Sequence, residues 1–171
     1  LVEKANIIKG DTKGEFRART YTDDELKLMF SEINDGSFNA FVRFAYYTGA
    51  RSGEIRSLSR ENVLDESLIV NGKTGRRIVK LNSQAQKIMQ HQDPLWSYSK
   101  DFVSHKFKQE DRKLDIKDAR FHDLRRTFGL NLIKQGMSIY KVSKLLGHSS
   151  VRTTEQHYAP LLTVEIEDFE L

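Results

Sequence analysis

The sequence predicts a mainly α-helical domain of the α+β class, with one small antiparallel β-sheet. Apolar residues recur at helical spacing in several segments, most clearly as Leu124, Phe128 and Leu132. Two short β-type runs, 68–70 and 77–81, are joined by five residues that include two glycines and an asparagine, which is typical of a hairpin. The 171 residues, 38% of them apolar, are enough for one domain with its own core.

The N-terminal half is expected to contain a polar arm followed by helices. Residues 1–19 carry five basic side chains and two glycines and are predicted to be a linker or arm. Thr22 and Glu25 have the spacing of a capping box, which predicts a helix over 23–33. Ser37 is expected to cap a second helix that Gly49 ends or bends, with an apolar face formed by Phe38, Phe41, Val42 and Ala45.

The C-terminal half is expected to be helical as well. Helices are predicted near 83–91 and 99–108, with a charged loop between 110 and 117. Further helices are predicted over 123–135, 139–146 and 150–158, since glycines or a proline follow each of them and Ser138 can cap the second. Residues 161–171 alternate apolar and acidic side chains, so we expect this tail to bury one side.

The charge and the composition of the chain limit the classes of partner and of cellular location that we expect. The net charge is +4, and because the last ten residues carry four acidic side chains, the rest of the chain carries +8. A basic body favours a polyanionic partner, although a slightly basic surface alone would give the same count. The chain has no cysteine and no apolar run of about 18 residues, which argues against a disulfide framework and a membrane span and fits a cytoplasmic protein.

Three segments carry residues suited to phosphate chemistry. They are TGARSGEI around Arg51, NGKTGRRIVKL around Lys73, and FHDLRRTFG…LLGHSSVRTTEQHYAP, which contains His122, Arg125, His148 and Tyr158. Attack on a phosphodiester builds negative charge on its oxygens, and the planar arginine fork can meet that charge with two parallel hydrogen bonds. A tyrosine hydroxyl can be the nucleophile if a base or a positive field assists its ionisation.

Together and in this order, the segments resemble the catalytic domain of the tyrosine recombinase (phage integrase) family, over about residues 20–160. The resemblance implies a helical DNA breaking-rejoining domain that acts on double-stranded DNA without a metal or nucleotide cofactor, and that is nucleoid-associated when bound. Tyr158 would form a 3′-phosphotyrosyl link, and Arg51 and Arg125 would clamp the phosphate. His122 would be the general base, His148 would hydrogen-bond the phosphate or orient the site, and Lys73 would be the general acid. The tail 161–171 would either dock on a neighbouring protomer in a DNA-bound tetramer or fold back on its own domain.

Several alternatives remain open at this point. Arg51 could instead pair with Glu54, one helical turn away. Arg126 points about 100° away from Arg125 on a helix, so we expect it in a salt bridge or a backbone phosphate contact, and His157 is left out of the catalytic set. Residues 139–158 also have the outline of a helix-turn-helix, so a non-catalytic DNA-binding protein is one competing function. A type IB topoisomerase-like enzyme and an inactive remnant of a recombinase are the other two.

Overall fold

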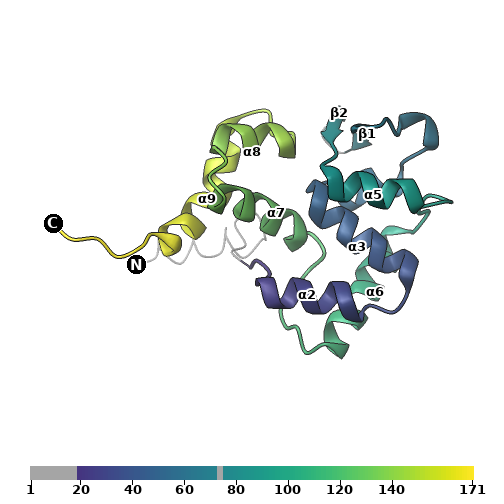
Figure 1. The fold of residues 1–171 in the computed structure, drawn as a ribbon, viewed down its shortest axis with the longest axis horizontal. Helices are drawn as coiled ribbons and strands as arrows, with labels where there is room; N and C mark the ends of the chain where they lie inside the picture. The colour runs from purple at the N-terminus through teal and green to yellow at the C-terminus, as the bar shows by residue number, and fades with distance from the viewer. Residues whose placement is uncertain (1–18, 73–74) are drawn as a thin grey trace, which may run out of the picture.

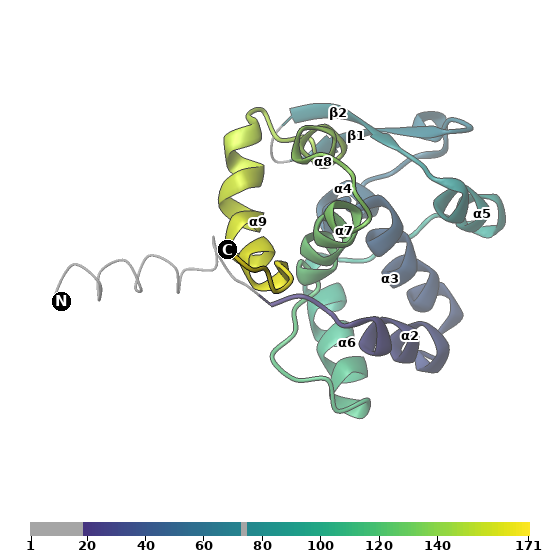
Figure 2. The ribbon, with the colours of Figure 1, turned by 60° about the vertical axis from the view of Figure 1, so that its left-hand side comes forward.

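Helices around a central α3 make up most of the molecule, as the sequence predicted. The computed structural model describes residues 19–72 and 75–171. Helix α3 (Gly36–Thr48) packs against α2 (Asp23–Glu32), α5 (Ser83–His91) and α7 (Asp123–Lys134). Helix α8 (Ile139–Leu146) and helix α9 (Val151–Glu165) pack on the far side of α7, and α8 lies next to the hairpin (Figures 1 and 2).

The first helices begin at polar caps, one of which differs from the prediction. The capping box of Thr22 and Glu25 is present at the start of α2. Helix α3 is capped by Asp35, whose Oδ1 accepts from the backbone N–H of Phe38 at 3.1 Å, and not by Ser37 as expected. A carboxylate satisfies the same free N–H groups as a hydroxyl and adds a favourable interaction with the helix dipole.

The predicted hairpin is present and its turn is shorter than expected. Strands β1 (Ser67–Gly72) and β2 (Gly75–Lys80) are antiparallel, with Leu68 opposite Val79 and Gly72 opposite Gly75. The ladder therefore continues to the glycines, and two residues, not five, connect the strands. Just before the hairpin lie a short helix α4 (Ser52–Arg56) and a 3-10 turn (Arg60–Asn62), and α4 packs on β1.

Two of the C-terminal helices run further than predicted. Helix α6 (Lys100–Lys113) continues through part of the expected charged loop, because Glu110 and Asp111 are buried. Helix α9 continues past Pro160, which lies inside it. A proline removes one helical donor and crowds the carbonyl four residues before it. The next turn is nevertheless held by Leu161 and Leu162, which pack on a cluster formed by Leu130, Val142, Leu146 and Tyr158.

The C-terminal tail leaves the body of the domain. After α9, the side chains of Ile166 and Phe169 are 64% and 70% exposed, and Leu171 is fully exposed. Figure 1 shows residues 166–171 extending away from the helices. Residues 166–171 therefore do not fold back on their own domain, while Leu161 and Leu162 are half-buried within α9. The alternative, that the tail buries its apolar side on a neighbouring protomer, stays a prediction. Over the part of the chain that is described, no helix is long and apolar enough to cross a membrane.

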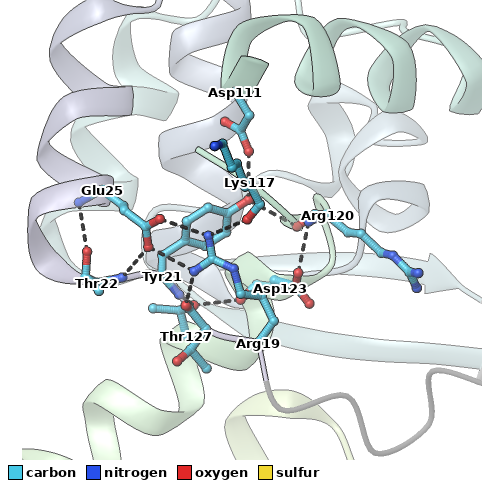
Figure 3. A network of polar contacts seen from close by, with 10 residues as sticks. Arg19, Tyr21, Thr22, Glu25, Asp111, Lys117, Arg120, Asp123 and Thr127 are labelled. Carbon is cyan, nitrogen blue, oxygen red and sulfur yellow. Dashed lines mark hydrogen bonds and ion pairs between the residues drawn. The ribbon is translucent and has the colours of Figure 1, made fainter. Parts of the chain in front are cut away.

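A polar network joins the start of the described chain to α6 and α7 (Figure 3). The guanidinium of Arg19 donates to both carboxylate oxygens of Glu25 at 2.9 and 2.8 Å and to the carbonyl of Lys117 at 2.9 Å. The backbone N–H of Tyr21 donates to the hydroxyl of Thr127 on α7 at 2.9 Å. The segment that enters the domain is thereby fixed against the helix that carries most of the candidate site.

The same network buries an acid, Asp111, and this predicts a pH dependence of stability. Its Oδ2 accepts from the hydroxyl of Tyr21 at 3.1 Å, while burial raises the pKa of Asp111 from 3.8 to about 7. A raised folded-state pKa stabilises the fold most below pH 3.8, and this contribution is lost as the pH rises to about 7. We expect Asp111→Asn, which resembles the protonated acid, to lose less thermal stability than the wild type between about pH 5 and pH 8.

Thermal unfolding followed by circular dichroism measures this difference, with Asp115→Asn as the control because Asp115 is 84% exposed. An equal fall in Tm with pH for the wild type and Asp111→Asn would show that Asp111 is ionised in the folded protein throughout.

Candidate active site

Five of the six residues singled out in the sequence border one small cavity of about 70 Å³. Lys73, the sixth, lies outside the described residues. Helices α7, α8 and α9 and the start of α4 converge here, and the residues that line the cavity are Arg51, His122, Arg125, Arg126, Leu146, His148, His157 and Tyr158. A larger groove of about 840 Å³ beside α5 contains none of the six, so the chemistry and not the size of the cavity identifies the site.

Arg125 is the most buried cation of the cavity, with 5% of its surface exposed. Its two terminal nitrogens donate to the carbonyls of Gly49 and Leu146, each at 2.7 Å. Among the described residues no carboxylate lies within ion-pair distance of it. Burial, together with the charges of Arg51 and Arg77, lowers the pKa of Arg125 to about 9. A cation held in this way, without an acidic partner, is suited to bind an anion.

The guanidinium of Arg51 lies near Glu54 without making a hydrogen bond to that carboxylate. Its Nη1 is 3.8 Å from Oε2 of Glu54, and this buried nitrogen has no hydrogen-bond partner. Glu54 is instead held by Arg77 of β2, whose Nε and Nη2 donate to its two oxygens at 2.7 and 2.9 Å. The alternative pairing of Arg51 with Glu54 is therefore weak, and the guanidinium of Arg51 can face the cavity.

Arg77 was not singled out in the sequence. The signal that could have found it is the alternation along β2, which places Arg77 on the same side of the strand as the buried Val79. The two segments that its guanidinium contacts lie 23 and 68 positions away, so no local pattern identifies its role.

The two histidines that the sequence singled out, His122 and His148, are uncharged at neutral pH. Burial lowers the pKa of His148 to about 4, with Arg125 adding to the effect, and its Nδ1 shares a hydrogen bond of 2.6 Å with the hydroxyl of Thr154. Partial removal of the His122 ring from water lowers its pKa as well, helped by Arg125 and Arg126. The side chain of His122 is nevertheless exposed to solvent. Both rings therefore have an uncharged form that can accept a proton.

Tyr158 is 2% exposed and packs against the backbone of α7. A Cβ atom at Gly129 would lie 2.1 Å from the Tyr158 oxygen, so the ring fits only because that position is glycine. The Tyr158 hydroxyl donates to the carbonyl of Arg125 at 3.5 Å, a long hydrogen bond. Burial raises the pKa of Tyr158 to about 12, against the charges of Arg125 and Arg126. In this conformation the phenol is protonated and lies beside Arg125 and Arg126.

Arg126 and His157 also border the cavity, although the sequence analysis left them out. The expected salt bridge of Arg126 is present, with its Nε 3.8 Å from Oδ1 of Asp123. Arg126 and Arg125 leave α7 about 100° apart. Both nevertheless border the same cavity, because Tyr158 and His148 lie over the first turn of that helix. The ring of His157 lies 5.7 Å from that of His148, centroid to centroid. Within residues 19–72 and 75–171, no three acidic or histidine side chains gather in a way that could hold a metal ion.

Comparisons with known proteins place most of the chain beside tyrosine recombinases and integrases. The sequence model of the phage integrase family matches residues 95–163. Tyrosine recombinase XerA of Saccharolobus solfataricus is 30% identical over 125 residues, which cover 67% of this chain and 43% of that protein. The chain thus spans less than two thirds of the length of the curated relatives it matches first.

Solved structures show the same fold. The catalytic domain of bacteriophage HP1 integrase superposes with a TM-score of 0.68 at 17% identity, covering 86% of this chain and 94% of that one. The Tn1549 transposon integrase in complex with transposon right-end DNA gives a TM-score of 0.69 at 15% identity, covering 88% and 66%.

Proposed function

This chain belongs to the phage integrase family of tyrosine recombinases, and we propose that residues 20–160 form the domain in which such an enzyme breaks and rejoins double-stranded DNA. On this proposal residues 1–19 are a basic arm and residues 161–171 a C-terminal tail, and the reaction takes place on DNA in the cytoplasm. The observation that carries the proposal is the meeting of Arg51, Arg125 and Tyr158 at one cavity.

The charge of the cavity supports a phosphate as the group it binds. Arg125 has no acidic partner among the described residues, and the nearest acid to Arg51 is already held by Arg77. A phosphodiester placed there would receive hydrogen bonds from both guanidinium groups and would balance their charge. The same groups would meet the additional negative charge that develops during attack on phosphorus.

The proposed reaction exchanges one phosphate ester for another. The oxygen of Tyr158 forms a bond to phosphorus, the bond from phosphorus to the 5′ oxygen breaks, and a 3′-phosphotyrosyl link results. His122, which is uncharged at neutral pH, takes the proton of Tyr158, and Lys73 gives a proton to the departing 5′ oxygen. His148, oriented by Thr154, donates a hydrogen bond to the phosphate. Attack by a 5′ hydroxyl of a second strand reverses these steps and completes strand exchange.

Tyr158 must first leave its resting hydrogen bond. Its hydroxyl now contacts the carbonyl of Arg125, and the ring lies against Gly129. A bound phosphate would draw both arginines to itself, and because it is an anion it would not help the phenol to ionise, whose pKa burial already raises. The proton of Tyr158 must therefore pass to a base during the attack. We therefore propose that the DNA-bound enzyme has α9 shifted so that the phenol faces phosphorus.

A nicked duplex substrate tests the proposal. The chain is incubated with a duplex that loses its 5′ strand after cleavage, and detergent-resistant protein–DNA adducts are separated by electrophoresis. We expect a covalent adduct at Tyr158, found by peptide mapping. Binding of this duplex without any adduct would instead support the non-catalytic helix-turn-helix alternative. In a separate assay on supercoiled plasmid, relaxation without strand exchange would support the topoisomerase-like alternative.

The exposed tail supports self-association on DNA, which we propose as a tetramer. Ile166 and Phe169 are exposed and lie among acidic residues. An apolar groove of about 470 Å³ between β2, α7 and α8 is rimmed by Lys80, Lys141 and Lys144. Charge and hydrophobicity both match, so on this proposal the tail of one protomer docks in the groove of another.

Deletion of residues 166–171 is expected to weaken assembly on paired sites and to leave adduct formation at a single site close to wild type. These residues contact neither the cavity nor the core, so the fold is retained. Native gel electrophoresis with one-site and two-site DNA measures the effect, and Phe169→Ser gives a milder version of the same change. Unchanged cooperative assembly in both variants would contradict the proposed role of the tail.

A further inference from the structure

Arg77 joins the hairpin to two segments that border the candidate active site, yet it does not border the cavity itself. It projects from β2, and its Nε and Nη2 donate to the two carboxylate oxygens of Glu54 on α4 at 2.7 and 2.9 Å. Its Nη1 donates to the carbonyl of Leu145, at the end of α8, at 3.2 Å. One side chain therefore connects the hairpin, α4 and the turn that leads into α9.

Through its contact with Glu54, Arg77 acts on the start of α4. Oε1 of Glu54 accepts from Arg77 and also from the backbone N–H of Arg51, the latter at 2.8 Å. Burial alone would raise the pKa of Glu54, but the hydrogen bonds from Arg77 and from the Arg51 backbone bring it below its ordinary value. The carboxylate is thus ionised and fixed, and it fixes the residue from which the Arg51 side chain leaves the backbone.

Arg77 also supports the turn that carries His148. Gly147 has a left-handed backbone, with φ of +73°, and a Cβ there would lie 2.6 Å from Cδ of Arg77. The arginine stem therefore packs directly on Gly147, the residue before His148. The next carbonyl along this turn, that of Leu146, accepts from Arg125 at 2.7 Å. Arg77 and Arg125 hold adjacent carbonyls of one turn, so their positions depend on each other.

We propose that Arg77 is a positioning residue, which keeps Arg51 and His148 at the distance needed to bind one phosphate between them. This inference rests on the proposed function, since it concerns the geometry of the same phosphate site. A lysine has one point of charge and cannot hold both oxygens of Glu54 and the carbonyl of Leu145 together. Without Arg77, Glu54 would be free to turn to Arg51, whose Nη1 is already 3.8 Å away, and would compete with the phosphate.

The test compares Arg77→Met and Arg77→Lys with Arg76→Met in the full chain. Arg76 is the neighbouring arginine on the exposed side of β2, so its loss removes the same charge without these contacts. Adduct formation is measured under single-turnover conditions with saturating nicked duplex, per folded protein. We expect a rate about tenfold to a hundredfold lower for Arg77→Met, an intermediate rate for Arg77→Lys and a nearly unchanged rate for Arg76→Met.

A second substrate separates the phosphate side from the leaving-group side. When sulfur replaces the bridging 5′ oxygen, the departing thiolate needs no proton, so a defect in leaving-group protonation disappears. We expect the Arg77→Met defect to persist with the sulfur substrate. Recovery of the rate would overturn the proposal, because it would place the effect on the proton donor and not on Arg51 and His148.

A third measurement does not depend on activity. Inorganic phosphate is titrated while the His148 ring signal is followed by NMR, and we expect several-fold weaker binding to Arg77→Met than to Arg76→Met. Lower thermal stability with unchanged phosphate affinity and unchanged rate would show a merely structural role and overturn the proposal. If wild-type protein binds phosphate at this site but forms no adduct on DNA, the proposed function fails while the inference about Arg77 is still decided by the phosphate titration.

Discussion

Tyr158→Phe is expected to fold like the wild type and to form no covalent adduct with DNA. The substitution removes one oxygen, and that oxygen makes only a long hydrogen bond of 3.5 Å to the carbonyl of Arg125. The loss of stability should be about 1 kcal/mol or less, while the loss of the nucleophile should bring adduct formation below detection. Nicked duplex, detergent electrophoresis and a thermal melt together measure both outcomes.

Tyr140→Phe is the matched control, because Tyr140 is 61% exposed and lies outside the cavity. It should form adduct at the wild-type rate. Adduct in Tyr158→Phe at the wild-type level would show that another residue is the nucleophile, and mapping of the attached peptide would identify it.

The helices of this domain could be predicted because their signals are local. Thr22 with Glu25, Ser138 and Gly147 lie within one turn of the ends that they mark, and the structure confirms these ends. Pro160 misled the prediction of α9, because the packing of Leu161 and Leu162 on the cluster around Tyr158 outweighs the loss of one helical donor. Tertiary contacts of this kind leave no trace in a window of a few residues.

The candidate site divides in the same way. Its arginines, histidines and tyrosine were found from their spacing and from the resemblance, and five of them meet at one cavity. The residues that hold them were missed. Arg77 is 23 positions from Glu54, and no feature of the sequence distinguishes the hydroxyl of Thr154, which contacts His148, from other helical hydroxyls. Arg126 was judged from its angle on a straight helix, which ignores that α9 folds back over the first turn of α7.

The largest effect after that of Tyr158 is expected from Arg125→Lys. Arg125 donates to Gly49 and Leu146 at the same time and, on the proposed function, offers its remaining N–H groups to the phosphate. Lysine keeps the positive charge but has no planar fork, so it cannot reach both carbonyls and two phosphate oxygens. We expect adduct formation to slow by about a hundredfold to a thousandfold, as when a transition-state donor is removed.

The fold should also weaken, by about 1–3 kcal/mol, since a buried carbonyl loses its donor. Single-turnover rates at saturating DNA, corrected for the folded fraction, separate this from the chemical effect. Arg56→Lys is the control, because Arg56 lies on α4 near the site without bordering the cavity. A rate for Arg125→Lys within about threefold of that control would mean that charge alone suffices, and that no paired hydrogen bonds from Arg125 stabilise the transition state.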